Sequence, residues 1–232
     1  LCFSISLSNN HVKYDFLKSY NDLEIESWNK DNFYDVNFKS LYDSYLYDNQ
    51  YGSFNIHILK ETKSAIISQF NEKEYPLMNL GVGIFSALEG VRTWYDTSNM
   101  NEYAVIKFSK KKTIEILLME NHDFCSYMIL KKRGESFQII NHLGNQHFKE
   151  KLLQSIESIF QEDFDSINFK IFYYSIGGSK KDIEIVSRYS SSKIKLINPF
   201  KNLRFDDGIR GIKGVNASEY SEIGNVFRGI DA

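Results

Sequence analysis

Residues 168–200 read NFKIFYYSIGGSKKDIEIVSRYSSSKIKLINPF, and this stretch decides the fold class of the chain. Residues 169–174 are aromatic and branched, which is typical of a buried strand, and Gly177-Gly178 then lets the backbone turn without a Cβ clash. After a helical segment, residues 193–197 alternate as a second strand that stops at Asn198-Pro199, because proline cannot donate to a strand ladder. The pattern predicts a β-α-β unit.

The helix of this unit has a recognisable start. Ser179 and Asp182 have the spacing of a capping box, so we expect the helix to begin at Lys180. A helix N-terminus that follows two glycines can also hold an anion on its free N–H groups. The sequence therefore leaves two interpretations of Gly177 and Gly178, a plain turn or part of an anion site.

Composition limits the possible functions. The 232 residues are 42% hydrophobic and 15% aromatic, which is enough for a packed core. A net charge of -2 gives no global electrostatic footprint for nucleic acid, so we expect no nucleic-acid partner. Cys2 and Cys125 have no second cysteine at metal spacing and are typical of reduced core residues in a cytosolic protein. No apolar run approaches the ~20 residues of a membrane helix. Whether residues precede Leu1 or an anchor follows Ala232 stays open.

The first hundred residues alternate between strand and helix signals. Residues 1–16 alternate apolar and polar side chains around Asn9-Asn10, which predicts a β-hairpin. Helical spacing of aromatic residues predicts a helix over 34–48, and a second helix is expected over 84–95. Between them we expect strands at 54–59 and 65–70.

The pattern then restarts near Asn101. Strands are predicted at 103–108, 113–119, 124–130 and 137–140, and an amphipathic helix at 148–160. Lys110, Lys111 and Lys112 form a basic turn which, with Lys107, could collect an anion or lie in water. A terminal helix over 217–229 is expected to pack on the half that contains residue 1.

Two halves, each a run of antiparallel strands followed by alternating helix and strand, predict an α/β protein with duplicated subdomains and a central cleft. The actin-like (ribonuclease H-like) architecture has this plan. It places a hairpin loop from each half against the phosphates of a nucleotide and a Gly-Gly turn near the adenosine. We expect residues 1–100 with 211–232 to form the first subdomain and residues 101–210 the second.

Once these loops are located, the chain resembles the actin-like assembly proteins of type IV pili and type II secretion, the PilM, MshI and GspL group. The family's first loop, roughly I-D-I-G-S-x-S-V-K, lies over residues 5–13, and its second, V-D-I-G-x-x-x-T, over residues 106–113. The family's Gly-Gly turn matches Gly177-Gly178. Its N-P-F and G-x-x-x-R-G tail matches residues 198–200 and 224–229.

The departures from the family bear on mechanism. Where ATP-binding relatives carry an acidic residue for Mg²⁺-bound water, this chain has Ser6 and Lys107, and where they carry glycine it has Ser8 and Ser109. A lysine at the acidic position repels the metal, so we expect no ATP hydrolysis and no bound cofactor. The resemblance implies a degenerate nucleotide cleft formed by the following residues: Ser8, Asn9, Asn10, Ser109, Lys110, Gly177, Gly178 and Ser179.

Other chemistry has little support in the sequence. The five histidines show no H-x-x-x-H or H-E-x-x-H spacing, so we expect no metal site. No G-x-S-x-G motif supports a nucleophile elbow, although a Ser-His-Asp triad assembled by the fold stays open. We expect no catalytic residues.

The resemblance implies a non-enzymatic scaffold at the cytoplasmic face of the inner membrane. Its partner would be a bitopic pilus or secretion protein, with a secretion ATPase as a further partner. Tyr34, Tyr42 and Tyr45 belong to an aromatic-rich stretch that would bind a peptide of that partner in the first half, or would simply lie in the core. The alternatives are a nucleotide-dependent phosphotransferase or ATPase of the same fold and a small actin-like protein of unknown role.

Overall fold

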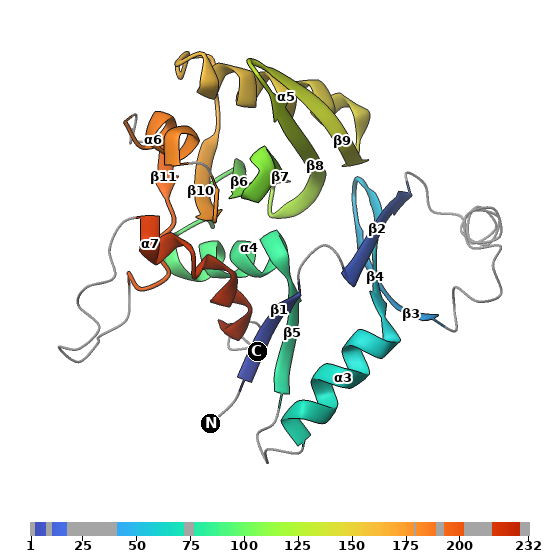
Figure 1. The fold of residues 1–232 in the computed structure, drawn as a ribbon. Coiled ribbons are helices and arrows are strands. Elements are labelled where there is room, and N and C mark those ends of the chain that lie inside the picture. The colour runs from blue at the N-terminus through green and yellow to red at the C-terminus, as the bar shows by residue number, and fades with distance from the viewer. Residues whose placement is uncertain are drawn as a thin grey trace.

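A computed structural model describes residues 3–7, 11–17, 41–71, 77–178, 180–188, 193–201 and 215–227 (Figure 1). Its largest sheet has six strands in the order β11-β10-β6-β7-β8-β9. Strands β6 to β9 form an antiparallel meander, and β10 and β11 add parallel to β6 on its other side. The strands are β6 (Glu102–Ser109), β7 (Thr113–Glu120), β8 (Asp123–Arg133), β9 (Ser136–Gly144), β10 (Lys170–Ile176) and β11 (Ile194–Leu196).

Helices cover both faces of this sheet. On one face, α5 (Gln146–Phe160) and α6 (Lys180–Arg188) pack on a core that includes Ile106, Leu118 and Ile171. On the other face, α4 (Gly83–Trp94) packs on Val105, Leu117 and further side chains. These alternate along the same strands with the side chains of the first core. Both faces of the central strands are therefore buried, which explains their nearly continuous apolar sequences. The predicted β-α-β unit of residues 168–200 is confirmed, with its helix beginning at Lys180.

The first half contains two smaller sheets. Strand β1 (Phe3–Leu7) pairs parallel with β5 (Leu77–Val82), and β2 (Val12–Leu17) belongs to an antiparallel sheet of order β2-β4-β3. Strands β3 (Tyr42–Asn49) and β4 (Gly52–Leu59) are joined by a tight turn, and α3 (Lys60–Asn71) connects β4 to β5. The prediction of a hairpin over residues 1–16 is wrong in its pairing, because β1 and β2 lie in different sheets.

Two other predictions in the first half are also wrong. Helical spacing favoured a helix over 34–48, but residues 42–49 form the strand β3, and residues 34–40 lie outside the described part of the chain. Tyrosines here also recur at alternate positions, and pairing with β4 determines the outcome. The strand predicted at residues 65–70 is absent, because these residues belong to α3. Helix α3 has no strong apolar stripe, so its sequence gave little helical signal.

The same succession of elements occurs in both halves. Antiparallel strands are followed by a helix, by a strand parallel to the first strand of that half, and by a second helix. In the first half these are β1 to β4, α3, β5 and α4, and in the second half β6 to β9, α5, β10 and α6. This duplication is the predicted actin-like α/β fold. The subdomain boundaries at residues 100 and 210 stay a prediction.

The C-terminal segment returns to the first half. The predicted continuous helix over 217–229 is instead a short helix, α7 (Val215–Ser218), followed by a 3-10 helix, η4 (Ser221–Phe227). As expected, η4 packs on α4, β1 and β5, the elements of the half that contains residue 1 (Figure 1). Among the described residues no helix is long and apolar enough to cross a membrane.

Candidate functional site

Lys107 lies at the centre of a buried polar network between the two halves. Its side chain projects from β6 toward α4 and η4, on the same face as Val105. The Lys107 ammonium lies 2.6 Å from a carboxylate oxygen of Glu222 on η4 and 3.5 Å from one of Glu115 on β7. Lys107 is 8% exposed and Glu115 4% exposed, so these charges are almost entirely removed from water.

Tyrosine hydroxyls complete the network. Tyr174 on β10 donates a hydrogen bond of 2.9 Å to Glu222, and Tyr127 on β8 donates one of 2.9 Å to Glu115. A buried carboxylate is tolerated when its lone pairs are satisfied in this way. Burial by itself lowers the pKa of Lys107, but attraction to Glu115 and Glu222 outweighs it, and the pKa of Lys107 is raised. Burial and the same two carboxylates raise the pKa values of Tyr174 and Tyr14 well above the ordinary value of a tyrosine.

This network corrects the expectation for Lys107. The sequence left Lys107 either as an anion collector or as a charge in water, and the structure shows an ammonium enclosed by two carboxylates. A further anion at this point would meet Glu115 and Glu222 at close range and would be repelled. The basic turn is exposed at all three of its lysines, Lys110, Lys111 and Lys112, which agrees with the interpretation that they lie in water.

The structure brings together four of the predicted nucleotide-cleft residues. Ser109 forms an isolated β-bridge with Gly177, and the Lys110 side chain lies against Gly177. The Gly178 N–H donates to Ser175 Oγ at 3.1 Å, and a Cβ on Gly178 would lie 2.7 Å from that oxygen and 3.1 Å from the Phe108 carbonyl. The Gly-Gly turn thus fits tightly against the end of β6. Ser8, Asn9, Asn10 and Ser179 lie outside the described residues.

An apolar groove of about 510 Å³ opens in the first half. It lies between the β3–β4 hairpin and α3 on one side and β5 and α4 on the other, with Met119 and Phe124 of the second half at one end. Its lining is mostly aliphatic and aromatic. The side chains that line it include Tyr45, Phe54, Ile56, Ile58, Lys63, Ile67, Leu77, Leu80, Val82, Phe85, Leu88, Glu89 and Arg92.

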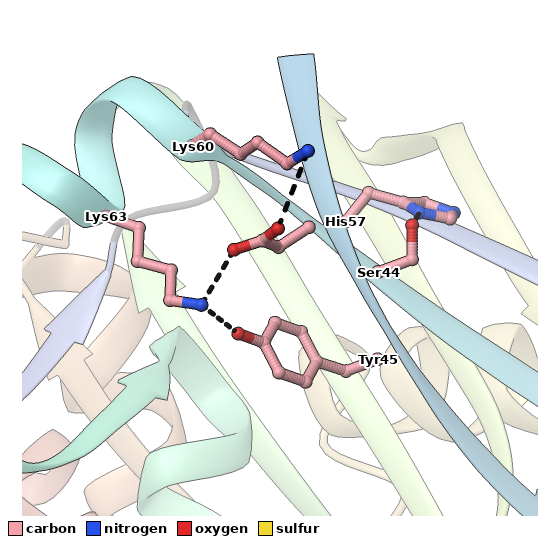
Figure 2. A network of polar contacts seen from close by, with 6 residues as sticks. Ser44, Tyr45, His57, Lys60 and Lys63 are labelled. Atoms are coloured by element: carbon pink, nitrogen blue, oxygen red, sulfur yellow. Dashed lines mark hydrogen bonds and ion pairs between the residues drawn. The ribbon is translucent and has the colours of Figure 1, made fainter. Parts of the chain in front are cut away.

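Charged groups at the rim of the groove are paired with one another. The Lys63 ammonium donates to Asp43 at 2.7 Å and to the Tyr45 hydroxyl at 2.8 Å, while Lys60 lies 3.9 Å from the same Asp43 carboxylate (Figure 2). Hydrogen bonding to Lys63 lowers the pKa of Asp43, and hydrogen bonding to Asp43 raises that of Lys63. On the α4 side, Arg92 pairs with Glu89 at 3.3 Å. Each of these three cations therefore already has a carboxylate partner.

The predicted tyrosine surface is divided by the structure. Tyr45 is 46% exposed and lines the groove. Tyr42 is half-buried on the opposite face of β3, where the Lys13 ammonium lies 4.8 Å from its ring centroid. Tyr34 lies outside the described residues. Of the three tyrosines proposed for partner binding, Tyr45 is placed in the groove and Tyr42 is placed away from it.

The fold also assembles a Ser-His-Asp chain across the sheet β2-β4-β3. Ser44 Oγ lies 2.7 Å from His57 Nδ1, and His57 Nε2 lies 3.0 Å from an Asp15 carboxylate oxygen. Figure 2 shows Ser44 beside His57. The groove is on the other face of β4, because Phe54, Ile56 and Ile58 alternate with His57. We interpret the chain as a cross-strand network that satisfies a buried histidine. Among the described residues no His, Cys, Asp and Glu cluster could hold a metal.

Glu115 and Glu222 are the site residues that sequence reasoning missed. Glu115 had a visible signal, because it is an acidic residue inside the apolar strand TIEILLME. Glu222 had none, since it lies in a polar C-terminal segment and meets Lys107 only through the fold. The number of residues between Lys107 and Glu222 hides this contact from any local pattern.

Comparison with known proteins supports the fold. Neither a protein-family model nor a curated protein sequence matches this chain. A chain of the solved PilM-PilN type IV pilus biogenesis complex matches 99% of this chain and 80% of its own length, with a TM-score of 0.56 and 12% identity. A Bacteroides thetaiotaomicron protein of unknown function with an actin-like ATPase fold covers 86% of this chain and 69% of its own length, with a TM-score of 0.40 and 11% identity. The match to the chain of the PilM-PilN complex supports the actin-like fold that the two similar halves define.

Proposed function

We propose that this chain is a non-enzymatic scaffold of the actin-like class, which binds a short peptide of an inner-membrane protein in its apolar groove. It acts at the cytoplasmic face of a pilus or secretion platform and links that partner to the assembly motor, a secretion ATPase. The observation that carries the proposal is the groove itself. Its 510 Å³ can hold several large side chains, and Tyr45, Ile67 and Phe85 offer the aromatic and aliphatic contacts that anchor peptides.

Electrostatics at the rim favour an apolar peptide over a charged one. Lys63 and Arg92 already pair with Asp43 and Glu89, so a charged ligand would compete with existing ion pairs. The shared fold adds support, because a solved structure with a similar fold is the PilM-PilN type IV pilus biogenesis complex. For this chain, peptide recognition would rest on buried apolar side chains rather than on charge.

The network around Lys107 supports a scaffold rather than an enzyme. Lys107 stands where the resemblance places an acidic residue for Mg²⁺-bound water, and its ammonium is held by Glu115 and Glu222. A metal-bound triphosphate would require this cation to leave and both carboxylates to take up other partners. The geometry therefore favours a cleft that functions without a nucleotide.

A peptide panel tests the proposal. Fluorescently labelled peptides would cover the cytoplasmic segments of short single-span membrane proteins encoded beside this chain, and fluorescence polarisation would measure binding. We expect at least one peptide to bind with an affinity that changes little between low and high salt, because apolar contacts dominate. Failure of every peptide, or binding that high salt abolishes, would overturn the proposed groove function.

A further inference from the structure

The ion pair between Lys107 and Glu222 joins the two halves of the molecule. Lys107, Glu115, Tyr127 and Tyr174 all belong to the six-stranded sheet of the second half, whereas Glu222 comes from η4. Helix η4 packs on α4, β1 and β5. The two charges at 2.6 Å are therefore supplied by elements that belong to different halves.

Helix η4 is held tightly on the first half. A Cβ on Gly224 would lie 2.2 Å from the Ser86 carbonyl oxygen and 2.4 Å from the Gly90 nitrogen, so the backbones of η4 and α4 are in direct contact. Contacts between backbone atoms cannot relax by rotating a side chain. Any movement of Glu222 away from Lys107 therefore requires η4 and α4 to move together, or η4 to leave α4.

Separation of the ion pair would be unfavourable. Glu115 and Glu222 share one ammonium and two tyrosine donors, and a separated pair would leave a buried carboxylate without its cation. After separation, Lys107 on the sheet would keep Glu115 but lose Glu222, and the Tyr174 hydroxyl would lose Glu222 as its acceptor. Since all these groups are linked, they separate together or not at all.

We propose that Lys107 and Glu222 form a permanent tie that, together with the apolar packing of α4 on the six-stranded sheet, holds the two halves in a single relative arrangement without any ligand between them. Helix α4 contacts η4 through Ser86 and Gly90 and lines the groove through Phe85 and Leu88. The tie consequently fixes one wall of the groove as well. This consequence for the groove rests on the proposed function, whereas the tie itself does not.

Distances between the halves test the tie directly. Spin labels placed by S68C on α3 and Q154C on α5, both exposed positions, would report the separation by pulsed electron paramagnetic resonance in a C2S background. The native cysteine Cys125 is buried and does not compete for the label. We expect one narrow distance distribution, unchanged by ATP with Mg²⁺, and a broadened or shifted one in E222Q.

A matched control is available within the second half. Glu102 of β6 pairs with Lys151 of α5, so E102Q removes an ion pair without touching the contact between halves. We expect E102Q to keep the native distribution. Y174F removes only the hydroxyl that donates to Glu222, and it replaces E222Q in the test if E222Q fails to fold. We expect Y174F to broaden the distance distribution to a smaller extent. The tie is refuted if E222Q, or Y174F in its place, leaves the distribution as narrow and centred as in the unmodified chain.

Discussion

The ammonium of Lys107 lies 2.6 Å from the carboxylate of Glu222, in the interface between the two halves of an actin-like fold. A cation at this point changes what the fold can do. A carboxylate there could help to hold a metal ion, whereas an ammonium repels a metal, and the two carboxylates around it repel a phosphate. The fold is thus retained while its central charges are arranged to satisfy one another.

ATP binding is the first property that this arrangement predicts. We expect calorimetric titration with ATP and Mg²⁺ to show no binding tighter than ~1 mM, because the Glu115 and Glu222 carboxylates already hold the Lys107 ammonium, which would repel the metal. Phosphate release over the same concentrations should equal the buffer blank. Micromolar binding that G178V abolishes would contradict this, and would show that the Gly-Gly turn still holds a nucleotide.

Removal of the cation should destabilise the chain more than removal of one carboxylate charge. K107M leaves the Glu115 and Glu222 carboxylates beside each other without the Lys107 ammonium, and we expect a loss of about 3–5 kcal/mol in the free energy of unfolding. E222Q keeps a polar group beside Tyr174 and should lose about 1–3 kcal/mol. Urea unfolding followed by circular dichroism measures both, and equal losses would argue against a shared network.

The groove can be tested without disturbing the core. Ile67 is 36% exposed where it lines the groove, and Ile140 is 54% exposed on β9, far from it in the fold. I67E places a charge in the groove and should weaken binding of any peptide found by the panel at least tenfold, about 1.4 kcal/mol. I140E introduces the same charge elsewhere and should bind as the unmodified chain does. Equal effects of the two substitutions would place the peptide outside the groove.

Much of the fold could be predicted from local patterns, because the second half is built from long, regular signals. The strands of residues 103–140 and the helix at 148–160 follow from alternation and apolar periodicity, and both are confirmed. In the first half the signals conflict. Ile66 and Ile67 favour a strand but lie in α3, and the tyrosines near Tyr45 fit helix spacing but form β3. There, pairing with β4 outweighs local preference.

The candidate site was less predictable than the fold. The resemblance of residues 106–113 to the family's second loop marked Lys107 as a lysine where ATP-binding relatives have an acidic residue. The partners of Lys107, however, depend on three-dimensional packing. Glu222 reaches Lys107 only because η4 returns to the first half and fits against Gly90. The groove was equally hidden, since its lining comes from separate elements that carry ordinary core residues. Tyr45 was anticipated there, whereas Ile67 and Phe85 had no sequence signal.

His142 should make stability depend on pH. Burial, with a smaller contribution from Lys149, lowers the pKa of His142 to about 4 from its ordinary value of 6.5. Its Nε2 lies 2.8 Å from Ser126 Oγ, while its buried Nδ1 has no hydrogen-bond partner among the described residues. At a pH between about 4 and 6.5, His142 binds a proton in the unfolded chain but not in the folded chain. The free energy of unfolding therefore falls as the pH decreases from 6.5 toward 4.

A glutamine at this position separates the contribution of His142 from that of other groups. H142Q can keep the hydrogen bond to Ser126 but does not titrate. We expect the difference in unfolding free energy between the unmodified chain and H142Q to shift in favour of H142Q on acidification, by up to about 1.4 kcal/mol per pH unit. Thermal unfolding of both proteins at pH 7, 6 and 5 gives the measurement. A constant difference would show that His142 titrates normally in the folded chain.

The contact between η4 and α4 can be tested at a single glycine. In G224A the new methyl group would lie 2.2 Å from the Ser86 carbonyl oxygen and 2.4 Å from the Gly90 nitrogen, so η4 must move away from α4 and carry Glu222 with it. We expect a loss of about 1–3 kcal/mol in unfolding free energy and faster amide hydrogen exchange in both α4 and η4. G134A is the control, because Gly134 has a φ of +64° with open space around it. It should cost about 1–2 kcal/mol through backbone strain alone and leave exchange in α4 unchanged. If G224A and G134A have the same exchange pattern in α4, η4 does not support that helix, and Glu222 is held by the second half alone.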